Sequence, residues 1–166
     1  MLEKLKEWAI VGDGGCMYNL AVMYETGEGV AQDLKESAYW LQKAAETEHI
    51  DAMKEYAAKL RTGTDFIEQN QTAAINLYKE IIKLYGDEEA MANFVDMCSL
   101  GEGVPKNDSN SLNFLLDKIG RRCNAIYQHG SWGFQTMRED ECTMDYLRGL
   151  ERRRIARRAR RLLNED

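Results

Sequence analysis

The side chains that could do chemistry in this chain are few, and they are spread along its length. Its thiols and imidazoles, the usual zinc ligands, are these: Cys16, Cys98, Cys123, Cys142, His49 and His129. The one cluster, Cys123, His129 and Cys142, has spacings of six and 13 residues that match no common zinc arrangement, and the chain has no CxxC pair. We therefore expect no metal site, no cofactor and reduced thiols.

Catalytic motifs give no stronger signal. The sequence contains no GxSxG, HExxH, P-loop or GxGxxG pattern. The acidic run Glu139-Asp140-Glu141 suggests paired-carboxylate chemistry, but no second acidic cluster is placed opposite it. A charged helix start, favoured by the helix dipole, explains the run equally well. We expect no catalytic residues and no enzymatic activity.

The charge is unevenly distributed. The net charge is −6 over 166 residues, yet residues 1–150 carry 15 basic and 25 acidic side chains, and residues 151–166 carry seven arginines and three acids. The amino-terminal residues lack the basic and apolar regions of a secretory signal, and no apolar run approaches the roughly 20 residues that span a bilayer. These features predict a cytoplasmic protein with an acidic body and a basic tail.

A repeated segment indicates which elements must position any functional side chain. Gly27-Glu28-Gly29-Val30 recurs as Gly101-Glu102-Gly103-Val104, 74 residues later, and Gly63 lies midway between the two copies. A fixed period near 37 residues is typical of stacked helical repeats. Such proteins act through extended surfaces, so the repeat directs attention from pockets to helix faces.

The first repeat has the clearest helical pattern. One helix buries a face at i, i+3, i+4 and i+7, ends at Gly27, and is followed by a second helix that Asp33 caps, with Glu36 completing a capping box. The predicted core positions of the two helices are Met17, Leu20, Ala21 and Tyr24, then Ser37, Trp40, Leu41, Ala44 and Ala45.

Two further copies and an amino-terminal helix complete the pattern. The first helices of the copies bury these residues: Ala52, Met53, Tyr56, Ala57 and Leu60, then Ala90, Met91, Phe94, Val95 and Cys98. The second helices use Asn70, Ala74, Leu77, Tyr78, Ile81 and Ile82, then Asn107, Ser111, Phe114, Leu115 and Ile119. Leu5–Ala9 matches residues 41–45, which predicts a capping helix before the first repeat.

The segment YNLAVMYETGEGVAQDLKESAYWLQKAA resembles the Sel1-like repeat, a relative of the tetratricopeptide repeat. The resemblance covers residues 5 to about 120 and implies an all-α fold, a right-handed α/α superhelix of about three helical hairpins. The residue patterns add an N-terminal capping helix and a C-terminal Arg-rich helix. We expect a repeat solenoid over residues 1–120 and a capping extension over 121–166. The family resemblance also implies a non-enzymatic adaptor or scaffold for a protein or peptide partner, and many members look bacterial.

In related superhelices the first helices line the concave side. The equivalent positions, which we call the inner face, are Tyr18, Val22, Glu25, Lys54, Arg61, Asp96 and Ser99. They would suit an extended peptide with a carboxylate near its middle, because two cations stand between an aromatic end and an acid. The alternative is an ordinary solvated surface.

The carboxyl-terminal segment carries a separate candidate. From about Arg138 a helix is expected, with its apolar stripe at Met144, Leu147, Ile155, Ala159 and Leu162. Its basic face comprises Arg153, Arg154, Arg157, Arg158 and Arg161. Three roles remain open: a solvated cap, a docking element for an acidic protein or for another copy, and a contact for nucleic acid. The last two make the chain a small regulator, the alternative function.

Overall fold

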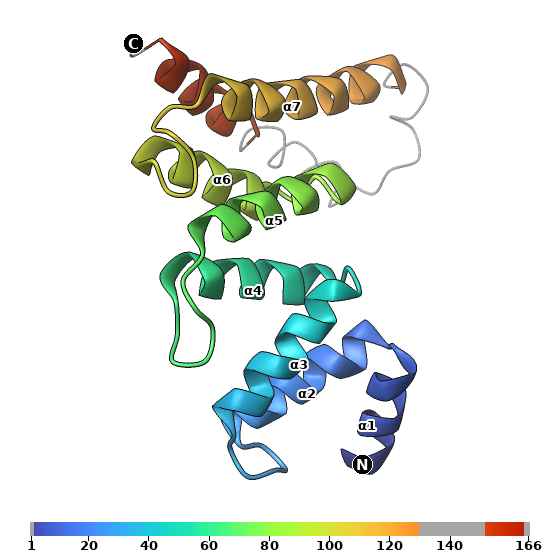
Figure 1. Cartoon of the computed structure of the whole chain (residues 1–166). Helices are drawn as coiled ribbons and strands as arrows, with labels where there is room; N and C mark the ends of the chain where they lie inside the picture. Colours follow the sequence, from blue (N-terminus) through green and yellow to red (C-terminus); the bar gives the residue numbers. More distant parts are fainter. Residues whose placement is uncertain (1, 130–151, 165–166) are drawn as a thin grey trace. The chain divides into compact units, whose positions relative to one another are not determined.

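The computed structural model describes residues 2–129 and 152–164, which are helical and contain no strand (Figure 1). The helices are α1 Leu2–Val11, α2 Gly14–Thr26, α3 Leu34–Glu46, α4 Ile50–Thr62, α5 Gln71–Leu84, α6 Glu88–Leu100 and α7 Ser109–His129. Residues 152–163 form a further segment, here called the C-terminal helix. The predicted pairs are therefore α2 with α3, α4 with α5, and α6 with α7.

The chain divides into two compact units, which we describe separately. Unit 1 is Met1–Ile81 and unit 2 is Ile82–Asp166, so the boundary lies in the last turn of α5. The sequence analysis placed a different boundary at residue 120, where the repeats were expected to end and the extension to begin. That boundary stays a prediction.

Each helical pair is closed by the same backbone hydrogen bond. The residue that ends the loop donates its N–H to a carbonyl near the end of the preceding helix. The three bonds run from Asp33 to Tyr24 (2.9 Å), from Asn70 to Leu60 (2.8 Å) and from Asn107 to Cys98 (2.9 Å). The period in the sequence is thus a period in backbone geometry.

Glycine ends the first helix of each pair, as predicted. Gly27 and Gly101 have φ values of 75° and 79°, in the left-handed region that side chains with a Cβ avoid. Their N–H groups donate to the carbonyls of Met23 and Met97, over 2.8 and 2.9 Å. Gly63 makes the equivalent bond to Lys59, also over 2.8 Å, with φ 78°. This turn chemistry is why the repeat is visible in the sequence.

The helix starts are capped by side chains, with one correction to the prediction. Asp33 Oδ1 accepts from the N–H groups of Lys35 and Glu36, over 3.0 and 3.1 Å, and Asn70 Oδ1 accepts from Ala73 over 2.9 Å. Asn107 was expected to begin the second helix of the third pair, but it has φ 56° and lies outside that helix. Asp108 caps α7 instead, because one more residue separates the closing bond from the helix start.

The core of the second helices follows a spacing of 37 residues. Three equivalent sets are buried in all copies: Ser37, Ala74 and Ser111; Leu41, Tyr78 and Leu115; Ala45, Ile82 and Ile119. Small side chains in the first set let paired helices approach closely. A fourth set was predicted to be core and is only half-buried: Trp40, Leu77 and Phe114. It lies at the edge of the buried stripe, where one side of the helix meets solvent.

Helix α1 packs on α2, as expected for a helix that precedes the first repeat. Ala9 is fully buried, whereas Trp8 is 60% exposed. The turn into α2 is short, because the N–H groups of Gly12 and Asp13 donate to the carbonyls of Ala9 and Trp8, both over 3.1 Å. Asp13 then caps α2 by accepting from Cys16 over 2.7 Å.

We expect Asp33→Ala to lower the free energy of unfolding by about 1 kcal/mol, because two N–H groups at the start of α3 lose their acceptor. Urea denaturation followed by circular dichroism measures the change. Asp65→Ala is the matched control, since Asp65 is an exposed loop residue that caps no helix. Equal stability of the two variants would contradict the capping role.

Candidate functional site

A connected set of polar side chains joins α2 to α4 in unit 1. The Tyr18 hydroxyl donates to Glu55 Oε2 over 3.1 Å. Lys59 Nζ lies 2.8 Å from Glu55 Oε1 and 2.9 Å from Glu25 Oε1. The two first helices are therefore linked near both ends of their shared surface, and two predicted residues of the inner face, Tyr18 and Glu25, belong to this network.

The protonation of the network is fixed by its surroundings. Burial raises the pKa of the Tyr18 hydroxyl, and the nearby Glu55 carboxylate raises it further, so the hydroxyl keeps its proton and donates. Burial lowers the pKa of Lys59, but its hydrogen bonds with Glu55 and Glu25 outweigh burial and leave the pKa raised. Lys59 therefore stays charged between the two carboxylates.

Tyr18 is held by an aromatic contact as well. Its ring stacks on the imidazole of His49, with centroids 5.2 Å apart and planes inclined by 26°. His49 occupies the N-cap of α4, where Nδ1 accepts from the N–H of Ala52 over 3.4 Å. The equivalent caps of α2 and α6 are the aspartates Asp13 and Asp87. The stacking partner of Tyr18 is thus itself fixed by a helix start.

The other predicted inner-face residues of unit 1 lie on the same two helices. Val22, Lys54 and Arg61 are each half-buried. Lys54 Nζ lies 3.8 Å from Asp51 Oδ1, one turn earlier on α4. Sequence reasoning missed Glu55 and Lys59, although their i, i+4 spacing with opposite charges is a recognisable signal. Residue spacing alone does not show which neighbouring position of α4 turns toward α2.

The two inner-face residues of unit 2 are engaged within the chain. Asp96 Oδ1 accepts a hydrogen bond from Arg158 of the C-terminal helix. The Ser99 hydroxyl donates to the carbonyl of Asp96 over 2.8 Å. The inner face of unit 2 is therefore in contact with the basic face of the C-terminal helix, and the sequence analysis did not predict this contact.

The C-terminal helix packs on unit 2 through an apolar stripe and two arginines. Ile155, Ala156, Ala159 and Leu162 are buried. Arg152 pairs with Glu88 and Arg158 with Asp96, so the helix runs in the same direction as α6. The exposed arginines are Arg153, Arg154, Arg157, Arg158, Arg160 and Arg161. Met144 and Leu147, the first part of the predicted stripe, lie outside the described residues.

The described residues offer little support for other kinds of site. Among the residues that the structure describes, no three His, Cys, Asp or Glu side chains gather in a way that can hold a metal ion. Cys16 and Cys98 are free thiols, half-buried and buried respectively. Cys123, His129, Cys142 and the run 139–141 lie where the structure describes no side chains. Within residues 2–129 and 152–164, no helix is both long and apolar enough to cross a bilayer.

We expect Tyr18→Phe and Glu55→Ala to be coupled by about 0.5–1.5 kcal/mol in a double-mutant cycle, because they share one hydrogen bond between α2 and α4. Urea denaturation of the two single variants and the double variant measures the coupling. Tyr18→Phe combined with Glu36→Gln, on the exposed part of α3, is the control and should be additive. Additive effects in the Tyr18–Glu55 cycle would show that the bond contributes nothing.

Comparisons with known proteins agree with this repeat geometry. The Sel1 repeat family model matches residues 15–47, 50–84 and 89–116, more than half of the chain. No match was found among curated proteins.

Solved structures similar to this chain include two from bacteria. A Sel1 repeat protein from Oxalobacter formigenes has a TM-score of 0.62 and 23% identity, over 72% of this chain and 49% of that one. The second is c5321, described as a protective antigen present in uropathogenic Escherichia coli strains displaying an SLR fold. It has a TM-score of 0.60 and 25% identity, over 73% of this chain and 26% of its own. This chain thus spans about half and about a quarter of their lengths. With its three matched repeats, the chain belongs to the Sel1 repeat family, and its fold is the α/α solenoid of that family.

Proposed function

We propose that this chain is a non-enzymatic adaptor that binds an extended peptide or a protein segment on the inner face of unit 1. Membership of the Sel1 repeat family supports a role in protein–protein interaction. The observation that carries the proposal is the network of Tyr18, Glu55, Lys59 and Glu25, which fixes two first helices side by side. A surface that is already ordered loses little conformational entropy when a partner binds.

The chemistry of the face suggests what the partner carries. Tyr18 offers an aromatic ring held by His49, and Val22 offers an aliphatic side chain one turn later on α2. Lys54 and Arg61 add cations along α4. An extended peptide with an apolar side chain and a nearby carboxylate meets these requirements.

The inner-face residues of unit 2 are less suitable for binding a partner than those of unit 1. Asp96 and Ser99 already interact within the chain, Asp96 with the C-terminal helix. A partner that used them would have to displace Arg158. We therefore centre the proposed site on α2 and α4.

The C-terminal helix supports a second candidate function, in which the chain is a small regulator that binds an acidic protein or nucleic acid. Arg157, Arg160 and Arg161 are exposed on this helix. Arg152 and Arg158, by contrast, pair with acids of α6, which favours the capping role for that part of the helix. The adaptor function is therefore preferred.

We also propose a cytoplasmic location and a bacterial source. The free thiols of Cys16 and Cys98 suit a reducing compartment. Both solved structures described above are of bacterial proteins.

Arg61→Glu should weaken capture of the partner at least about tenfold, because it reverses a charge on the proposed face. Affinity purification of partners, followed by titration of the captured protein, measures the effect. Lys83→Glu is the charge-matched control, since Lys83 is exposed on α5, a second helix. Equal losses in both variants would point to net charge and would refute a specific inner-face site.

For the basic helix, replacing Arg157, Arg160 and Arg161 by glutamine should leave stability unchanged, because the pairs of Arg152 and Arg158 with α6 are kept. If the regulator function holds, the triple variant loses binding to duplex DNA or to an acidic peptide. For DNA, the logarithm of affinity should depend on the logarithm of salt less steeply, by about 2.7 for three lost phosphate contacts. Absence of binding by the unchanged chain at low salt would eliminate this function.

A further inference from the structure

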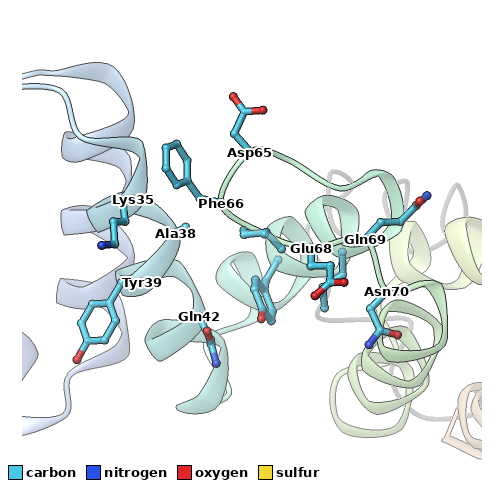
Figure 2. Close-up of a pocket in the computed structure, with 12 residues that line it drawn as sticks. Lys35, Ala38, Tyr39, Gln42, Asp65, Phe66, Glu68, Gln69 and Asn70 are labelled. Atoms are coloured by element: carbon cyan, nitrogen blue, oxygen red, sulfur yellow. The ribbon is translucent and has the colours of Figure 1, made fainter.

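A groove in unit 1 lies away from the inner face, between α3 and the loop that joins α4 to α5 (Figure 2). It encloses about 740 Å³ and is bounded by Lys35, Tyr39 and Gln42 on one side and by residues 65–70 on the other. Tyr56 and Leu60 of α4 contribute the remaining wall. The volume falls in the range of sites that bind small ligands or individual side chains of a peptide.

The loop is where the second repeat departs from the other two. The first and third loops contain Gly-Glu-Gly-Val, whereas the second reads Gly63-Thr64-Asp65-Phe66-Ile67 and is one residue longer. The second loop nevertheless keeps a hydrogen bond that is also present in the first loop. Gln69 donates to the carbonyl of Arg61 over 3.0 Å, as Gln32 donates to that of Glu25 over 2.8 Å. The extra length therefore changes what the loop presents and leaves its closure intact.

Phe66 is the new side chain that this loop presents. It is 52% exposed and, as Figure 2 shows, projects from the loop toward the Lys35–Ala38 turn of α3. Its neighbour Ile67 is buried and already supplies the apolar anchor of the loop. Tyr39 of α3 is also 52% exposed, but its ring packs edge-on against that of Trp40, with centroids 5.3 Å apart, and Figure 2 shows it directed away from Phe66. Because half of the Phe66 side chain remains in water while Ile67 already anchors the loop, packing of the loop does not account for Phe66.

The loop holds Phe66 in a defined position. The N–H of Thr64 donates to the carbonyl of Ile67 over 2.8 Å, and the N–H of Ile67 donates to the Thr64 hydroxyl over 3.1 Å. These reciprocal bonds close the segment around Asp65 and Phe66. Exposed aromatic side chains on an ordered loop are typical of binding hot spots.

The charge of the groove selects the partner. Asp65 and Glu68 are exposed on the loop and Lys35 is exposed on α3, which leaves an excess of negative charge. Within the described part of the chain, neither Asp65 nor Glu68 takes part in an ion pair. A basic side chain would therefore gain a complementary partner here, and an acidic one would be repelled.

We propose that this groove binds an extended protein segment in which an apolar side chain, packed against Phe66, lies next to a lysine or arginine that pairs with Asp65 or Glu68. The inference is independent of the inner-face proposal, because the groove is formed by the loop of the second repeat and by α3, the second helix of the first repeat. The chain would then hold two segments of opposite charge preference on different surfaces of unit 1, as an adaptor requires.

Fluorescence anisotropy with two labelled octapeptides tests the proposal on the full chain. One peptide alternates leucine with arginine, and the other alternates leucine with glutamate. We expect the arginine peptide to bind at least about tenfold more tightly than the glutamate peptide, and to lose affinity when salt is raised.

Variants locate the binding. Phe66→Ser should weaken the arginine peptide at least about tenfold while the circular dichroism spectrum is unchanged, since the Phe66 side chain is half exposed. Leu100→Ser is the matched control, because Leu100 is 64% exposed and lies in unit 2. Failure of the arginine peptide to bind, or unchanged affinity in the Phe66→Ser variant, would overturn the proposal. So would loss of binding in Tyr18→Ser instead, which would assign the peptide to the inner face and leave the adaptor function standing.

Discussion

Every helical pair in this protein depends on one local closure. A glycine with positive φ ends the first helix, and a backbone N–H six or seven residues later returns to the carbonyl of a residue in its last turn. Because this closure sets where the second helix starts, it also sets which side chains of the two helices meet. The buried Ser37, Ala74 and Ser111 then allow close approach, and the larger core residues follow at fixed intervals. The middle loop gains a residue and still makes the same bond, so the closure tolerates change in what the loop displays.

Because the closure tolerates such changes, the residues that maintain the fold are different from the residues that the loop exposes. In the second repeat the frame of the loop survives while Phe66 becomes exposed beside α3. In the same repeat a histidine replaces the aspartate that caps the other first helices, and Tyr18 stacks on it. Both departures from the repeat pattern lie in unit 1, next to the proposed binding surfaces. A repeat protein can change such positions individually, because each repeat contacts only its neighbours.

Charged side chains serve two different purposes here. Lys59 between Glu25 and Glu55 joins neighbouring first helices, and its pKa is raised although burial alone would lower it. Arg152 and Arg158 join the C-terminal helix to α6 and thereby use part of the basic charge that the sequence places in the tail. The acidic body and the basic tail are therefore not simply two opposed regions, since some of their charges neutralise each other across unit 2.

The sequence by itself determined the repeat helices, the caps Asp33 and Asn70, the closing glycines and most of the core, because these depend on local backbone preferences that recur with the period of the repeat. It placed Trp40 in the core, although that ring is half-buried, and it placed Asn107 at a helix start one residue too early. Only the tertiary structure decided that Glu55 and Lys59 face α2 and that Arg158 meets Asp96. The physical reason is that one residue turns a helix surface by about 100°, so the angle between packed helices selects the partners that spacing leaves undetermined.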